Sequence, residues 1–192
     1  MTESRLFLVR HGATEWSVDG KHTSITDLPL LPEGEQQARS LAPTLASHAF
    51  VQVLTSPRLR ARRTAELAGF ADPQVDDDLA EWDYGDYEGI TTPEIRETVP
   101  GWTIWDGAVP NGESAADVAA RLDRVVERAR SADGDTLVFA HGHSLRVLTA
   151  RWLGLDVADG RLFDLHTATL SILGDDRGQP VVELWNAASA LP

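Results

Sequence analysis

Short apolar runs alternate along the chain with longer stretches whose apolar positions recur at helical spacing. Three runs are rich in Val, Leu and Phe and lack polar alternation, which is typical of strands buried on both faces. They span residues 6–9, 51–54 and 137–140. Two further strands are predicted at residues 168–173 and 181–185, with a turn at residues 175–178 between them.

Helices are predicted at residues 33–47, 59–67, 114–130 and 144–153. Pro32 suits the first turn of the first of these, and Ser114 with Asp117 forms a capping-box-like pair at the start of the third. In that third helix, apolar residues at positions 118, 122, 125, 126 and 129 follow helical spacing. Strands that alternate with helices in this way predict a three-layer α/β/α sandwich with a mostly parallel central sheet.

One segment interrupts this alternation. Residues 83–113 hold glycines, prolines, Trp102 and Trp105, and they predict only a short helix at residues 93–97. An irregular excursion of this length in a compact domain usually covers a site. We see no repeat, low-complexity tract or domain linker. We therefore expect residues 1–192 to form one domain in which residues 83–113 act as a lid.

Composition excludes several classes of function. The 192 residues include 17 Lys and Arg against 30 Asp and Glu, for a net charge of −13, and no cysteine. Disulfide frameworks, thiol nucleophiles and cysteine-based zinc sites are excluded. The acidic balance argues against binding to nucleic acid or to an anionic membrane. The first residues do not resemble a secretory signal peptide, and no apolar run is long enough to span a membrane, so we expect a soluble cytoplasmic protein. Its oligomeric state is open, and a homo-oligomer is one possibility.

Candidate chemistry gathers where three predicted strands end. Arg10, His11 and Gly12 follow the first strand, and His141, Gly142 and His143 follow residues 137–140. Several arginines, at positions 58, 60, 62 and 63, come after the strand at residues 51–54. Groups just beyond the carboxyl ends of parallel strands face the ligand crevice. Cations gathered there in an acidic protein predict a pocket for a small multivalent anion, and phosphate matches the guanidinium fork best.

Each feature taken alone has an ordinary structural explanation. A single histidine at a strand end is more often a hydrogen-bonded structural residue than a catalytic one. The arginines from 58 to 63 could form a solvated helix face, and the pair His141 and His143 could be half of a metal site. The shared position at three strand ends is what favours a functional site.

Four motifs, in this order along the chain, resemble those of the histidine phosphatase superfamily in its phosphoglycerate-mutase-like branch. They are LVRHGATEW at residues 8–16, SPRLRARRTA at 56–65, LAEWDYGDYEG at 79–89 and FAHGH at 139–143. Residues 27–30 and 34–38 also match. The resemblance runs from about residue 6 to the last strand, and it implies the same α/β fold.

The resemblance implies that His11 is a nucleophile that forms a phosphohistidine intermediate. Its attacking nitrogen must then be unprotonated, with the N–H of the other ring nitrogen held by an acceptor. Arg10, Arg60 and His141 are expected to hold the oxygens of the transferring phosphoryl group. By the motif spacing, Arg60 rather than Arg58 takes this role.

Further phosphate contacts are expected from the side chains of Ser17 and Thr23 and from the backbone N–H of Gly142. Ser17 stands where the family more often has Asn. Glu81 matches the family's proton donor, which an alkoxide leaving group requires, and the same carboxylate then deprotonates water. Alone, Glu81 would be read as a surface carboxylate in an acidic run.

Other residues near the motifs are assigned to substrate contact or to no role. Trp82, Tyr84 and His143 are expected to contact the substrate. The remaining histidines lack a strand-end motif and are predicted to be incidental: His22, His48 and His166.

We expect a metal-independent, cofactor-free phosphatase that acts on small phosphorylated metabolites, with sugar phosphates as the first substrate class. Residues 82–120 contain Arg96 as their only cation, which provides little charge for a phosphoglycerate carboxylate. The segment also resembles a subgroup of fungal sugar-bisphosphatases and bacterial broad-specificity acid phosphatases. Three alternatives stay open: a phosphoglycerate mutase, a non-catalytic binder of phosphorylated ligands, and a metal-dependent hydrolase that uses His11, His141 and His143.

Overall fold

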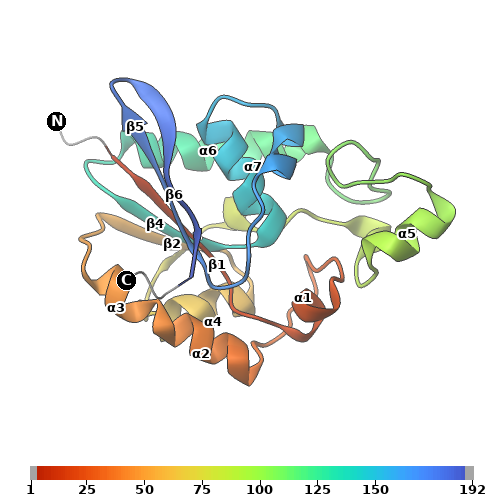
Figure 1. Ribbon diagram of the computed structural model, residues 1–192, viewed down its shortest axis with the longest axis horizontal. Helices are drawn as coiled ribbons and strands as arrows, with labels where there is room; N and C mark the ends of the chain where they lie inside the picture. Colours follow the sequence, from red (N-terminus) through yellow and green to blue (C-terminus); the bar gives the residue numbers. More distant parts are fainter. Residues whose placement is uncertain (1–3, 189–192) are drawn as a thin grey trace.

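The computed structural model describes residues 4–188, which form a six-stranded sheet between two groups of helices (Figure 1). The strands lie in the order β3-β2-β4-β1-β5-β6. The first four in this order are parallel to one another, whereas β5 is antiparallel to both β1 and β6. The strand bounds are Leu6–Arg10 (β1), Gln52–Thr55 (β2), Gln74–Val75 (β3), Thr136–Ala140 (β4), Leu170–Asp176 (β5) and Gln179–Ala187 (β6). The predicted α/β class with a mostly parallel sheet is confirmed.

The helices cover both faces of this sheet (Figure 1). In Figure 1, α2, α3 and α4 lie on one side and α6 and α7 on the other. The α-helices span Glu15–Asp19 (α1), Pro32–Ser40 (α2), Ala42–Ala46 (α3), Leu59–Leu67 (α4), Thr92–Thr98 (α5), Ala115–Ser131 (α6) and Gly142–Trp152 (α7). Three short 3-10 helices span Asp77–Leu79 (η1), Gly85–Tyr87 (η2) and Val157–Leu162 (η3).

Strand β1 shows why its sequence is apolar at every position. Successive side chains of a strand point to opposite faces. Leu6 and Leu8 belong to the core on the side of α6 and α7, whereas Phe7 and Val9 pack with residues of α3 and α4. All four side chains are fully buried. A strand covered by helices on both faces has no solvent-facing side, so polar alternation is absent.

Local sequence signals explain where the prediction succeeds and where it is wrong. Helix α4 has the predicted bounds, and α6 begins with the predicted capping box of Ser114 and Asp117. The single helix expected at residues 33–47 is instead two helices that meet at Leu41. Pro43 explains the break, because it has no N–H for the helical ladder and its ring clashes with the preceding turn. The five-residue α1 and the two-residue β3 were not predicted.

Residues 83–113 are largely irregular, as predicted, and include η2 and α5. Helix α5 contains the short helix predicted at residues 93–97 and starts with a capping box of Thr91 and Glu94. The segment is tied to the loop after α1, since Lys21 and Thr91 form a β-bridge and His22 N donates to Ile90 O at 3.0 Å. Its role as a lid stays a prediction.

No helix within residues 4–188 is long and apolar enough to cross a membrane.

Candidate active site

The predicted strand-end residues meet at one edge of the sheet. Parallel pairing of β1 and β2 with β4 brings their carboxyl ends to the same level. One more hydrogen bond extends each ladder, from His11 N to Ala140 O at 3.0 Å and from Ser56 N to Phe139 O at 2.9 Å. A cavity of about 200 Å³ lies beside this edge. It is lined by Arg10, His11, Thr14, Ser17, Gly20, Lys21, His22, Thr23, Glu81, Tyr84, Gly142, His143, Arg146, Asp164 and Leu165.

His11 lines this cavity, and a hydrogen bond to its own turn fixes which ring nitrogen carries the proton. Its Nδ1 lies 2.8 Å from the carbonyl oxygen of Gly12. A carbonyl can only accept, so Nδ1 carries the proton and donates. In the uncharged ring, Nε2 then keeps a free lone pair. This is the tautomer that a nucleophilic histidine requires.

The turn that carries His11 is held from both sides. Gly12 N donates to Thr64 Oγ1 at 3.0 Å, and Ala13 N donates to Gln37 Oε1 at 3.1 Å. Helix α2 packs directly on this turn, because a Cβ built at Gly34 would lie 2.2 Å from the Ala13 carbonyl oxygen. Glycine at position 34 therefore allows the backbones to approach closely enough for these hydrogen bonds.

The surroundings keep His11 uncharged. Burial lowers the pKa of His11 well below its ordinary value, and the positive charges of Arg60 and Arg10 lower it further. Both effects disfavour the imidazolium form. The guanidinium groups that suit a phosphate thus also protect the lone pair of the nucleophile.

Arg60 and His141 form a fully buried layer behind the cavity. Arg60 Nε donates to His141 Nδ1 at 3.2 Å, while its terminal nitrogens donate to the carbonyls of Thr23 and Thr26 at 2.9 and 3.1 Å. His141 Nε2 then carries the ring proton and lies 2.7 Å from Ser56 Oγ. Burial, with the charge of Arg60, lowers the pKa of His141 well below its ordinary value. Arg60 therefore orders both the loop after α1 and the ring of His141. The centroid of that ring lies 5.3 Å from the centroid of the His11 ring.

Arg10, the last residue of β1, lines the cavity and directly precedes His11. Its NH1 donates to Leu165 O at 2.5 Å, while its Nε is buried without a hydrogen-bond partner. A buried N–H of a charged group without a partner is costly, which favours an acceptor supplied by a ligand. Arg10 also lies against Gly142 at the start of α7, where backbone N–H groups favour anions.

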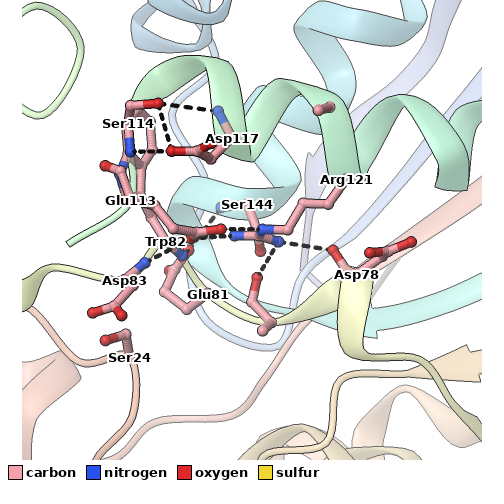
Figure 2. Close-up of polar contacts among 12 residues, drawn as sticks. Ser24, Asp78, Glu81, Trp82, Asp83, Glu113, Ser114, Asp117, Arg121 and Ser144 are labelled. Carbon is pink, nitrogen blue, oxygen red and sulfur yellow. Dashed lines mark hydrogen bonds and ion pairs between the residues drawn. The ribbon is translucent and has the colours of Figure 1, made fainter.

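Glu81 lies at the same helix start (Figure 2). Its Oε1 accepts from Ser144 N at 2.8 Å and from Trp82 N at 2.9 Å, and its Oε2 accepts from His143 N at 3.0 Å. The side chain lines the cavity although it is only 7% exposed. The N-terminus of α7 therefore positions a carboxylate opposite the strand end that carries His11.

Another part of the cavity lining consists of aromatic and uncharged imidazole groups. Tyr84 Oη lies 2.6 Å from His143 Nδ1, and the ring of His22 stacks near that of His143 with centroids 6.2 Å apart. Burial lowers the pKa of His143 well below its ordinary value and also lowers that of His22. Burial raises the pKa of Tyr84 well above its ordinary value. Lys21, Arg146 and Asp164 supply the charges of this part.

The structure separates the predicted site residues into three groups. Those in the cavity lining are Arg10, His11, Ser17, Thr23, Glu81, Tyr84, Gly142 and His143, and those directly behind it are Arg60 and His141. The hydroxyls of Ser17 and Thr23 donate to backbone carbonyls, of Thr14 at 2.8 Å and of Lys21 at 3.0 Å. Trp82 is outside the cavity lining, since its ring is 1% exposed in the core and its Nε1 donates to Glu113 O.

Sequence reasoning missed part of the site. His22 was expected to be incidental, but it lines the cavity, and its Nδ1 donates to Ile90 O at 2.8 Å. Lys21 was not singled out either. Both lie in a loop that long-range contacts fold back over the strand end, and neither has a strand-end motif. The available signal was Thr23, which matches a phosphate-contact position of the family. Lys21 and His22 directly precede it in the sequence and therefore lie close to the same site.

Histidine, aspartate and glutamate side chains within residues 4–188 form no group of three or more that could hold a metal ion.

Comparisons with known proteins agree with this geometry. A sequence model described as the histidine phosphatase superfamily (branch 1) matches residues 6–188. An acid phosphatase of Mycobacterium tuberculosis is 42% identical over 178 residues, covering 91% of this chain and 88% of the relative. A sedoheptulose 1,7-bisphosphatase of Saccharomyces cerevisiae is 41% identical, covering 80% and 69%. The structure of open reading frame Rv3214 from Mycobacterium tuberculosis has a TM-score of 0.91 at 38% identity, covering 97% of this chain and 99% of that one.

The lowered pKa of His11 predicts an uncharged imidazole at about pH 6, where an ordinary histidine is mostly protonated. Two-dimensional ¹⁵N NMR of the ring nitrogens should show the proton of His11 on Nδ1 and none on Nε2. The urea-unfolded chain is the reference, and His11→Gln identifies the signal. An imidazolium signal from His11 at this pH, or a proton on Nε2, contradicts the assignment.

Proposed function

We propose that this chain, which belongs to the histidine phosphatase superfamily (branch 1), uses His11 to hydrolyse phosphomonoesters of small sugars. Members of this family hydrolyse phosphoesters, and the chain is such an enzyme. One observation carries the assignment of the nucleophile. His11 is buried, donates from Nδ1 to the Gly12 carbonyl so that Nε2 keeps its lone pair, and lines a cavity that Arg10 also lines.

In the first step His11 Nε2 attacks phosphorus, and the bond to the ester oxygen breaks as the phosphohistidine forms. Arg10 binds the oxygens of the transferring group through its unpartnered Nε and its terminal nitrogens. Gly142 N at the start of α7 is a further donor. Arg60 and His141 stabilise the same negative charge from behind the cavity, and Ser17 and Thr23 complete its wall.

Glu81 transfers the protons of both steps. It donates a proton to the departing alkoxide, which otherwise leaves very slowly. In the second step the same carboxylate takes a proton from water as the water oxygen attacks the phosphohistidine. Its three backbone hydrogen bonds hold it at the cavity edge without using a side-chain proton. Inorganic phosphate and free His11 result.

The cavity wall formed by Tyr84, His22 and His143 supports a polyhydroxylated leaving group. Tyr84, His22 and His143 present a phenol and two uncharged imidazoles, which exchange hydrogen bonds with hydroxyl groups. His22 Nε2 is free to accept, since its Nδ1 donates to Ile90 O. Two relatives are named for acid phosphatase and sedoheptulose 1,7-bisphosphatase activity, and the net charge of −13 also suits a small substrate rather than nucleic acid.

One observation favours a second candidate, phosphoglycerate mutase activity. The sequence argument against it considered residues 82–120, but the cavity takes Lys21 and Arg146 from outside that segment. These cations could pair with a substrate carboxylate. Arg146 is partly engaged already, because its Nε donates to Gly160 O at 3.0 Å and its guanidinium lies 4.5 Å from the ring centroid of Trp105. Asp164 also lines this part and opposes a second anion.

A substrate panel separates these functions. We expect phosphate release from sugar monophosphates and bisphosphates to continue in EDTA and to fall to background in His11→Ala. Isomerisation of 3-phosphoglycerate with a bisphosphoglycerate primer should be much slower than this release. Loss of activity on chelation would instead favour a metal-dependent hydrolase. Faster isomerisation than hydrolysis would identify a mutase, and no release from any ester would identify a binder.

The acid role of Glu81 predicts a dependence on the leaving group. In Glu81→Gln, kcat/KM for an alkyl phosphate should fall by about 10²–10⁴-fold. The kcat/KM for p-nitrophenyl phosphate should fall far less, because nitrophenolate leaves without protonation. This parameter covers steps up to phosphorylation of His11, so slow hydrolysis of the intermediate does not affect it. Equal losses for both substrates would remove Glu81 from the acid role.

A further inference from the structure

A partly buried ion pair outside the cavity holds the chain on both sides of Glu81 (Figure 2). It joins Arg121 of α6 to Glu113, and neither residue lines the cavity described above. We propose that Arg121 and Glu113 are positioning residues that fix the backbone of Glu81 and so direct its carboxyl group during proton transfer. This inference rests on the proposed role of Glu81 as general acid.

Arg121 holds the backbone before Glu81. Its NH1 donates to the carbonyl oxygens of Asp78 at 2.7 Å and Ala80 at 2.8 Å. Its Nε and NH2 donate to the two carboxylate oxygens of Glu113 at 2.8 and 2.9 Å. The guanidinium therefore uses four of its five N–H groups in one planar arrangement, which a lysine ammonium cannot reproduce.

Glu113 holds the backbone after Glu81. Its Oε2 accepts from Asp83 N at 2.9 Å, in addition to the bond from Arg121. Its main chain adds two contacts, because its carbonyl accepts from Trp82 Nε1 at 2.9 Å and its N–H donates to Asp83 O at 3.0 Å. The ion pair thus connects residues 78–80 to residues 82–83, with Glu81 as the one residue between them.

The carboxyl group of Glu81 is held by the first turn of α7. Its two oxygens accept from His143 N and Ser144 N, as well as from Trp82 N. These bonds keep the carboxyl group at the cavity only while the backbone of Glu81 stays in place. Proton transfer requires the acid within hydrogen-bond reach of the leaving oxygen, so a shift of about 1 Å costs up to about 10²-fold in rate.

Burial makes this contact set difficult to replace. The side chain of Arg121 is 10% exposed, and that of Glu113 is 24% exposed. Without Arg121, the partly buried carbonyls of Asp78 and Ala80 lose their donors. We expect residues 78–83 to shift in order to satisfy these groups, which moves Glu81 relative to His11.

A second ion pair offers a matched control. Arg151 of α7 donates from Nε and NH2 to the two oxygens of Asp123 in α6, at 2.7 and 3.0 Å. It is also a two-point arginine–carboxylate pair on α6, but within residues 4–188 the hydrogen bonds of Arg151 go to Asp123 and Leu155 and not to residues 78–83. Arg151→Met therefore tests the general effect of losing such a pair.

The experiment compares kcat/KM for an alkyl phosphate with kcat/KM for p-nitrophenyl phosphate, in Arg121→Met, Glu113→Gln, Arg151→Met and Glu81→Gln. The ratio of the two values is taken within each preparation, so a reduced fraction of folded enzyme cancels. Glu113→Gln keeps the side-chain shape and the main-chain contacts, and it serves if Arg121→Met does not fold. We expect the ratio to fall by about 10- to 100-fold in Arg121→Met and Glu113→Gln, and to stay within about twofold of wild type in Arg151→Met.

The outcomes separate this inference from the function on which it rests. If Glu81→Gln lowers the ratio but Arg121→Met and Glu113→Gln leave it unchanged, Glu81 remains the acid and the positioning role is overturned. If Arg151→Met lowers the ratio as much as Arg121→Met, the effect is general destabilisation and the positioning role is again overturned. If Glu81→Gln does not lower the ratio, the acid role fails and the inference fails with it.

Discussion

The site depends on keeping an imidazole uncharged next to permanent cations. A nucleophilic histidine needs a free lone pair, whereas the phosphate it attacks needs positive charge nearby. Burial and the charges of Arg10 and Arg60 together lower the pKa of His11, so the groups suited to the substrate also suppress protonation of the nucleophile. The carbonyl of Gly12 then decides which nitrogen keeps the lone pair. One arrangement therefore meets both requirements.

The fold supplies this arrangement from the two sides of its sheet. Helices α2 and α4 hold the turn after β1 through Gln37 and Thr64, which sets the direction of His11. On the other side, the first turn of α7 holds Glu81, and α6 holds the chain around Glu81 through Arg121. Nucleophile and carboxylate are thus positioned by helices on opposite faces of the sheet (Figure 1).

Residues next to strand ends could be predicted from the sequence because their position follows from local pattern and parallel topology. His11 and His141 directly follow β1 and β4, and the structure brings their rings together. Residues placed by long-range contacts could not be predicted in this way. His22 enters the cavity because its loop pairs with residues 89–91, and Trp82 turns into the core because Glu113 accepts its N–H. Nothing local in the sequence indicates either contact. The break between α2 and α3, by contrast, has a local signal in Pro43.

The central claim is that His11 accepts the phosphoryl group. Rapid quenching of the enzyme with a ³²P-labelled sugar phosphate, followed by peptide mapping, tests it most directly. The account predicts an acid-labile, base-stable label on the peptide that contains His11, which forms fast enough for turnover and is absent from His11→Ala. A label on a serine, or turnover without any covalent label, would contradict it.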